Sequence, residues 1–212
     1  MSTRPYPSYK DSGVEWLGRI PAHWQIKRFR HVTKRVDVGI AEAATHAYAD
    51  EGVPILRSTN VRPNKILADD ILKIERWFAE KNRSKYLFKD DIVTVRTGNA
   101  GVSAVIPDEL HKSQCFTMLI STVKRQQCAQ FYCHLLNADV GQAVFRLEAW
   151  GTAQANISVP ILREVPVVEP PFPEQKVIAD FLDRETGKID ALVKKKERLI
   201  ELLQEKRTAL IS

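Results

Sequence analysis

The chain has 212 residues, of which 44% are hydrophobic and 27% charged, and a formal net charge of +6. This composition is typical of a folded domain with an extension. No apolar run reaches the length of about 18 residues that crosses a bilayer, and the first residues lack the pattern of a secretory signal. The three cysteines form no CxxC pair, which predicts reduced thiols in a cytoplasmic protein.

The basic excess lies almost wholly at the start of the chain. Residues 1–36 hold eight Lys or Arg against Asp11 and Glu15, whereas 37–173 carry −1 and 174–212 carry +1. A short basic run is often a solvated surface, but such runs also contact DNA phosphates. We predict phosphate contacts for five residues of KRFRHVTKR (27–35): Lys27, Arg28, Arg30, Lys34 and Arg35.

The middle of the chain alternates short apolar runs with turn signals. Five runs rich in Val, Ile and Thr predict strands: 53–57, 91–96, 102–106, 116–123 and 164–168. Residues 126–149 predict a helix broken near Gly141. Cys128, Cys133 and His134 could be proposed as metal ligands, but small thiols on a half-buried helix explain them better, and we predict no metal. The fold class is α+β, with residues 1–173 forming one mixed domain.

EPPFPEQ (169–175) resembles the catalytic tetrapeptide of amino-methyltransferases, with Glu169 where Asp, Asn or Ser is usual. No glycine-rich strand–turn–helix for an adenosyl cofactor accompanies it, because RTGNAG (96–101) precedes a strand-like run. A nuclease pattern joining Asp108 to Glu174 and Lys176 is too widely spaced to indicate a site. Proline disfavours helix in the residue before it and is tolerated in a first helical turn. We therefore interpret the prolines as a stiff connection into a helix and predict no catalytic residue.

Residues 174–212 predict one long helix with a heptad seam. Steps of four and three from Ile178 give ten seam positions, seven of them apolar: Ile178, Leu182, Glu185, Ile189, Leu192, Lys196, Leu199, Leu203, Lys206 and Leu210. A helix of this length spans about 58 Å, more than the rest of the chain easily covers. The seam favours a second copy as partner, the alternative being a helix that lies along its own domain. Lys196 and Lys206 weaken the seam or set its register.

Four motifs in order along the chain resemble the specificity subunit of type I restriction–modification systems: EWLGRIPAHW (15–24), GTAQANIS (151–158), PPFPEQKVIADFLD (170–183) and LIELLQEKRTALIS (199–212). VPILRSTNV (53–61) and FKDDIVTVRTGNAGVSAVI (88–106) resemble parts of that family's target-recognition domain. The resemblance implies a non-catalytic subunit with two such domains, each followed by a long helix, the helices pairing antiparallel. Each domain would read half of a bipartite DNA site.

The same resemblance implies partners that do the chemistry. Two adenine methyltransferase (modification) subunits would bring adenosylmethionine, and restriction and translocation subunits would use ATP and Mg²⁺. This chain has one domain and one helix, so we expect a half-length form that acts as a symmetric homodimer on a palindromic bipartite site. The alternative is a stand-alone basic DNA-binding coiled-coil dimer without enzymatic partners.

Base reading needs hydrogen-bonding side chains on loops that reach a groove. We predict base contacts for nine residues after the family-like strands and in GTAQANIS: Arg57, Ser58, Thr59, Asn60, Arg96, Thr97, Asn99, Gln154 and Asn156. Gly98 and Gly101 would let the backbone approach DNA closely. Asn and Ser are also common turn residues. Trp16 and Trp24 fit either a docking surface for the methyltransferase or plain packing.

Overall fold

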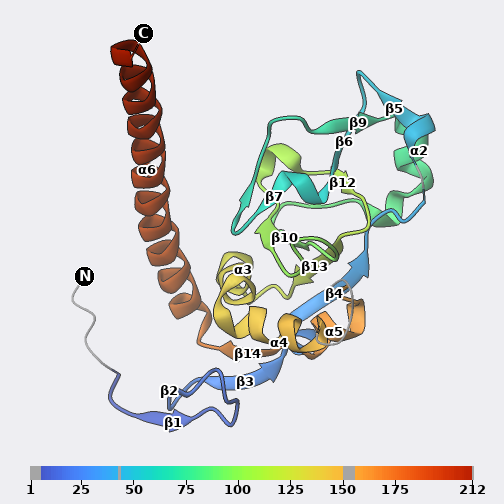
Figure 1. Cartoon of the computed structure of the whole chain (residues 1–212). Coiled ribbons are helices and arrows are strands. Elements are labelled where there is room, and N and C mark those ends of the chain that lie inside the picture. The colour runs from blue at the N-terminus through green and yellow to red at the C-terminus, as the bar shows by residue number, and fades with distance from the viewer. Residues whose placement is uncertain (1–5, 43, 150–155, 212) are drawn as a thin grey trace.

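Two four-stranded sheets form the frame of the fold (Figure 1). The computed structural model describes residues 6–42, 44–149 and 156–211. The first sheet is antiparallel with the order β11-β10-β13-β4, and its strands are β4 (Thr33–Val38), β10 (Asp91–Thr94), β11 (Ser103–Val105) and β13 (Leu119–Val123). The second has the order β12-β6-β9-β5, and its strands are β5 (Tyr48–Ala49), β6 (Val53–Leu56), β9 (Leu72–Ile74) and β12 (Gln114–Cys115).

Three strand pairs, six α-helices and four 3₁₀-helices of three residues each complete the regular structure of the described part of the chain. The pairs are β1 (Tyr9–Asp11) with β2 (Arg19–Pro21), β3 (Gln25–Arg28) with β14 (Pro166–Glu169), and β7 (Val61–Arg62) with β8 (Lys65–Ile66). The helices are α1 (Phe29–Val32), α2 (Arg76–Lys81), α3 (Ala129–Asn137), α4 (Asp139–Ala149), α5 (Val159–Glu164) and α6 (Phe172–Ile211). The β3–β14 pair joins the start of the chain to the strand that leads into α6.

The first sheet is buried on both faces. Neighbouring residues of a strand point to opposite faces, and in β10 Ile92 faces the core around α3 whereas Val93 faces the core under β6 and β7. Leu119 and Ile120 divide in the same way in β13. Burial on both faces explains why the regions of β10 and β13 read as mainly apolar runs, whereas β4 at the edge of the sheet, TKRVDV, does not.

All five predicted strands are strands, each shorter than predicted or displaced by one to three residues. The predicted helix over 126–149 is two helices, α3 and α4, separated at Ala138, whose backbone is extended (φ −72°, ψ 164°). A Cβ on Gly141 would lie 2.4 Å from the carbonyl oxygen of Leu136. Glycine therefore permits the first turn of α4 to approach the end of α3, which is why the break falls near this residue.

The helix α6 leaves the rest of the chain after three turns and extends away from it (Figure 1). Gln175 and Ala179 are buried against α3, whereas every residue from 186 to 209 is exposed. The alternative of a helix lying along its own domain is therefore wrong. α6 begins at Phe172, two residues before the predicted boundary. None of the described helices is long and apolar enough to cross a membrane.

Candidate DNA interface

The loop between β6 and β7 is held by its own polar side chains. The guanidinium of Arg57 donates to the carbonyl and the carboxylate of Asp70, at 2.9 and 2.6 Å. Asn60 is 2% exposed, accepts from the backbone N–H of Arg57 at 2.9 Å and donates to the carbonyl of Asp69. Ser58 and Thr59 are exposed. A base contact by Asn60 does not fit this burial, because its amide oxygen already bonds to Arg57 in the same loop and its amide nitrogen to Asp69 between β8 and β9.

A second loop follows β10 and is joined to the segment before α5 by Arg96. Its Nε donates to the carbonyl of Ile157 at 3.2 Å, and its Nη2 donates to Oδ1 of Asn156 at 3.4 Å. Thr97, Asn99 and Asn156 are exposed. Arg96 thus brings together side chains from two of the three predicted reading segments. Gln154, also predicted to contact bases, lies outside the described residues.

Glycines shape this second loop. Gly98 and Gly101 have φ values of +81° and +92°, which L side chains rarely adopt. A Cβ on Gly101 would lie 2.4 Å from the Phe145 ring and 3.0 Å from Nε2 of Gln142. The loop therefore rests directly on α4, and a cavity of about 310 Å³ lies between the two.

Arg146 at this cavity is a candidate that the sequence did not single out. It is exposed and lies four residues after Gln142, which donates to the carbonyls of Gly101 and Leu136. Residues four apart share one face of a helix. The spacing of two polar residues in a predicted helix was the available signal, although nothing local indicates which loop that face would meet.

Much of the basic run is paired with acidic residues far away in the sequence. Lys27 forms an ion pair with Glu169 across the β3–β14 ladder. Arg30 forms an ion pair with Glu164, and Arg28 donates to the carbonyl of Glu164 at 3.0 Å. These pairings hold β3 and α1 against α5 and β14, so they leave less positive charge for phosphate than the sequence alone indicates.

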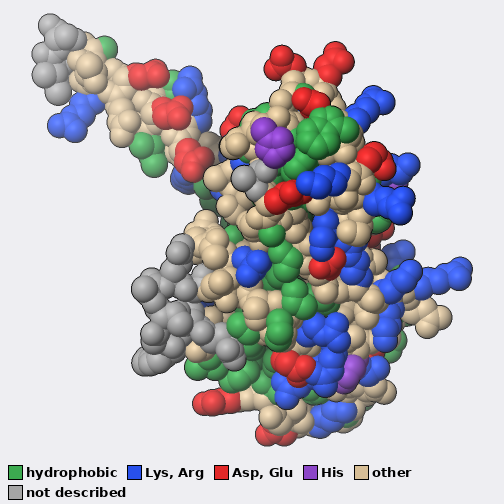
Figure 2. All heavy atoms as spheres, turned by 90° about the vertical axis from the view of Figure 1, so that its right-hand side faces the viewer, with side chains coloured by type: hydrophobic (Ala, Val, Ile, Leu, Met, Phe, Trp, Pro, Cys, Tyr) green, Lys and Arg blue, Asp and Glu red, His purple; other side chains and the backbone are tan. Residues whose placement is uncertain are grey.

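The other two basic residues of the run are Arg35, which is paired, and Lys34, which is not paired within the part of the chain that the structure describes. Arg35 donates to the carbonyls of Ser84 and Tyr86, at 2.7 and 3.3 Å, and lies 3.6 Å from the carboxylate of Asp37. Lys34 is exposed and has no hydrogen-bond or ion-pair partner among the described residues. Of the five predicted phosphate contacts, Lys34 has the most available charge. Figure 2 shows Lys and Arg side chains over the middle and right of one face, with Asp and Glu side chains among them.

The amino-terminal segment is fastened to the start of α6 through Glu174. The Glu174 carboxylate accepts hydrogen bonds from the Tyr6 hydroxyl and from the Trp24 indole at 3.1 Å, and lies 3.0 Å from Nε2 of His23. Burial raises the pKa of Glu174, but these three partners outweigh it and the pKa is lowered. Burial and the Glu174 carboxylate raise the pKa of Tyr6 to about 12.

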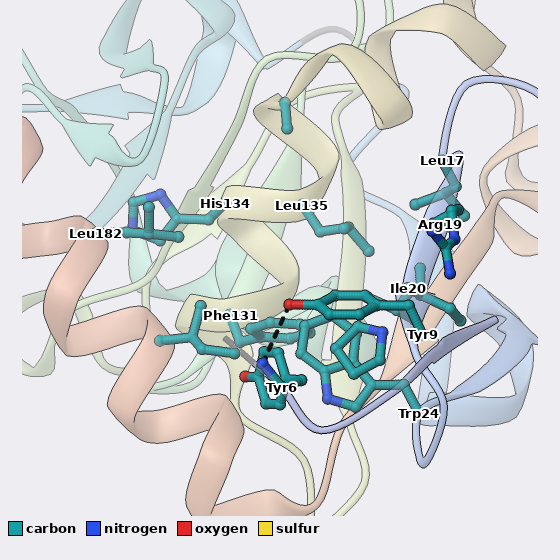
Figure 3. Close-up of a pocket in the computed structure, with 14 residues that line it drawn as sticks. Tyr6, Tyr9, Leu17, Arg19, Ile20, Trp24, Phe131, His134, Leu135 and Leu182 are labelled. Carbon is teal, nitrogen blue, oxygen red and sulfur yellow. Dashed lines mark hydrogen bonds between the residues drawn. The ribbon is translucent and has the colours of Figure 1, made fainter. Parts of the chain in front are cut away.

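A pocket of about 410 Å³ lies beside this contact (Figure 3). The rings of Tyr6, Tyr9, Trp24 and Phe131 gather at one side of it, and His134 and Leu182 lie at another. Ile178 and Leu182 of the α6 seam are among its lining residues. Trp24 packs against the core cluster around α3 and Trp16 is 38% exposed, so packing describes Trp24 better than Trp16.

The family assignment follows from the sequence pattern along most of the chain. A family model described as the type I restriction modification DNA specificity domain matches residues 39–202. The chain belongs to this family. The match takes in β6, β10, the loops that follow them and most of α6, and it confirms the resemblance to this family. Two of the four motifs, 151–158 and 170–183, lie wholly within the matched range.

Solved structures give the fold of this specificity domain a second line of support. The HsdS subunit from Thermoanaerobacter tengcongensis is 15% identical, with a TM-score of 0.61 over 82% of this chain and 44% of its own. The type I restriction–modification S subunit from M. genitalium is 15% identical, with a TM-score of 0.54 over 81% of this chain and 41% of its own. A chain from a structure of type I R-M complex assembly and conformational transition is 15% identical, with a TM-score of 0.60 over 89% of this chain and 42% of its own. The specificity domain therefore spans about two fifths of the length of these chains and shares their fold.

The cysteines of the specificity domain are free thiols. Burial raises the pKa of Cys115 to about 12 and also raises the pKa of Cys133. Cys133 lies on α3 and is buried, and His134 beside it is 2.6 Å from the carboxylate of Asp183 on α6. Within the described ranges, no group of three or more His, Cys, Asp or Glu side chains is arranged to hold a metal. Cys133 packs in the core cluster around α3, and His134 contributes to the contact between α3 and α6.

Proposed function

We propose that this chain reads one half of a bipartite DNA site and holds the enzymes that act there, as the specificity subunit of a type I restriction–modification complex. The observation that carries the proposal is that Arg96 joins the loop after β10 to the segment before α5 in a chain of the specificity family. The chain itself performs no chemistry. Adenosylmethionine, ATP and Mg²⁺ belong to the partner subunits. The complex acts in the cytoplasm, which the free buried thiols favour.

The reading atoms are the neutral side chains that the loops leave exposed. Thr97, Asn99 and Asn156 can donate to or accept from base edges in a groove. Arg96 positions the loop after β10 against the segment before α5, because two of its guanidinium nitrogens donate to that segment. Lys34 contacts phosphate, since its exposed charge is not paired within the described chain. Phosphate contacts set affinity, whereas base contacts set the sequence.

DNA selected from a random pool with the purified chain supplies the ligand for the test. Asn99→Ala should weaken binding to the selected duplex by roughly 10- to 100-fold and leave binding to random duplex nearly unchanged. Arg96→Ala should also weaken selected DNA more than random DNA, because both loops lose their link. Lys34→Ala should weaken both equally and lower the salt slope by about one. Equal losses on both duplexes for Asn99→Ala would contradict base reading by this loop.

The enzymatic partners are tested by co-expression. With an adenine methyltransferase subunit of the same type of system, the chain should purify as a stable complex that methylates DNA at a defined sequence. Methylation sequencing of that DNA then identifies the site. If the chain binds DNA selectively but never co-purifies with such a subunit, it does not recruit the methyltransferase. The proposal that it recognises a DNA sequence would be unaffected.

A second copy of the chain is the proposed partner of α6. Apolar side chains of the seam, Ile189, Leu192 and Leu203 among them, are more than half exposed. Burying the part of each side chain that is still exposed contributes roughly 1 kcal/mol, and an antiparallel pair would bury these side chains on both copies. Light scattering should give a mass of about 48 kDa, twice the 24.1 kDa of one chain. A mass of one chain at all concentrations would exclude the homodimer.

A further inference from the structure

Charged residues interrupt the seam of α6 at three of its ten positions. Glu185, Lys196 and Lys206 occupy seam positions, and the apolar residues between them are exposed, from 48% at Leu199 to 59% at Ile189. Charges within a helix–helix seam select the arrangement in which opposite charges face each other. The positions of these three residues therefore select among the ways in which two copies of α6 can pair.

A parallel pair places every seam residue opposite its own counterpart. Glu185 would then face Glu185, and Lys196 and Lys206 would each face another lysine, which gives three repulsive contacts along one seam. Antiparallel two-fold pairs differ from one another by one heptad. In only one of those registers does Glu185 face Lys196 of the other copy. Moving by one heptad in the direction of Lys206 places Glu185 against Leu203 instead.

We propose that two copies of α6 pair antiparallel about a two-fold axis between Asp190 and Ala191, with Glu185 of each copy bound to Lys196 of the other. This register rests on the proposed homodimer. All other seam contacts in it are apolar from Ile178 to Leu203. The ion pair forms twice because of the symmetry.

The apolar contacts of this register follow from the same axis. Ile189 of one copy meets Leu192 of the other, and Leu182 meets Leu199. Ile178 meets Leu203, which closes the paired stretch at the point where α6 enters its own domain. On one flank, Phe181 and Leu202, 40% and 45% exposed, face each other across the pair and extend the apolar contact.

The pocket beside α6 adjoins the amino-terminal end of the seam. Ile178 and Leu182 line that pocket together with Phe131 and Leu135 of α3 (Figure 3). In the proposed register the second copy brings its Leu203 to Ile178, so the last turns of its helix reach the mouth of the pocket. The pocket is an apolar site that the second copy completes, and the two starts of α6 lie about 55 Å apart.

Charge exchange tests the register on the full-length chain. Glu185→Lys alone and Lys196→Glu alone each create two like-charge contacts in the dimer and should raise its Kd roughly thirty-fold. The double exchange restores both pairs and should return the Kd to near the wild-type value. Mixing the two single variants should give a heterodimer, because each chain then supplies what the other lacks. Glu197→Lys and Lys194→Glu, on the opposite face of the helix, are the matched controls.

The outcomes separate the register from the homodimer and from DNA reading. Single variants that behave like the controls, in a chain that is still a dimer, overturn the register only. A wild-type chain that stays monomeric overturns the homodimer on which the register rests, whereas selective DNA binding is measured separately. Circular dichroism confirms that each variant keeps its helix.

Cysteine cross-linking gives an independent reading of the same geometry. Leu182→Cys mixed with Leu199→Cys should oxidise to a disulfide-linked heterodimer, since these positions face each other and a disulfide needs Cα atoms within about 7 Å. Leu182→Cys mixed with Lys206→Cys should not, because those two positions meet only in the neighbouring register. Cross-linking of the second pair but not the first would refute the proposal.

Discussion

Glu174 fastens the amino-terminal segment to α6, and its truncation gives a measurable prediction. In Glu174→Ala, the Tyr6 hydroxyl and the Trp24 indole lose their acceptor, and His23 loses the carboxylate beside it. The change leaves the helix itself intact, because Pro171 still accepts from the backbone of residue 174. The variant thus isolates the contact between the two segments.

The expected magnitude follows from these contacts. A hydrogen bond to a charged acceptor contributes about 1.5–3 kcal/mol, but the Glu174 side chain is 21% exposed and water replaces part of each bond. About 1 kcal/mol for each of the two neutral donors remains, and a carboxylate in the first turn of a helix contributes roughly 0.5 kcal/mol more. The free energy of unfolding should fall by about 2–3 kcal/mol, which lowers the Tm by about 5–10 °C in a chain of this length.

Urea unfolding followed by tryptophan fluorescence measures this loss. Glu197→Ala, an exposed glutamate on the same helix, serves as the control and should change stability by less than about 0.5 kcal/mol. We call the contacts of Glu174 with Tyr6, His23 and Trp24 the Glu174 clamp. A loss of stability below about 1 kcal/mol for Glu174→Ala would show that this clamp does not hold the two segments together.

The clamp also has a pH signature. Because the folded pKa of Glu174 is lowered, its stabilisation is complete above the unfolded pKa of about 4.3 and is lost as the pH falls through the folded value. The stability difference between wild type and Glu174→Ala should therefore be fully present at about pH 5 and shrink below about pH 4. A difference that stays constant into acid would contradict the lowered pKa.

Two further predictions concern the reading loops. Gly101→Ala should cost about 2–4 kcal/mol, because its Cβ meets the Phe145 ring at a left-handed φ, whereas Gly98→Ala, with open space around it, should cost only about 1–2 kcal/mol; thermal unfolding of both variants compares them. Asn60→Ala should cost about 1–3 kcal/mol by leaving loop groups unpaired, and exposed Ser58→Ala should be neutral. Equal costs within either pair of variants would count against the loop geometry.

The sequence predicted the elements whose signal is local. Runs of Val, Ile and Thr marked five strands, and a seam of period three and four marked α6, because side-chain periodicity depends only on the element itself. The strands that it missed in residues 9–38 contain few such runs: β3 is QIKR and β4 is TKRVDV. These strands form because β14 and β13 pair with them, and those partners lie more than 80 residues away.

Side-chain pairing was beyond the sequence for the same reason. Lys27 and Arg30 read as free positive charge, yet their partners Glu169 and Glu164 come after the whole middle of the chain. From the sequence Asn60 was predicted to contact bases because it follows a strand. In the structure the same position lets its amide bond to Arg57 and Asp69 instead. Local patterns give the type of residue on a loop, whereas the fold decides which of its hydrogen bonds remain open.

This division has a consequence for how DNA would be read. Arginine is the residue best suited to bind a guanine edge, but the guanidinium groups of Arg57 and Arg96 donate hydrogen bonds within their own chain. Of the base contacts predicted from the sequence, the exposed ones are neutral, with Thr97 and Asn99 among them. Neutral contacts release no counterions, so discrimination between selected and random DNA should change little with salt while overall affinity falls through phosphate contacts such as Lys34. Selectivity that collapses between low and high salt would show that an arginine leaves its anchoring bonds to meet a base.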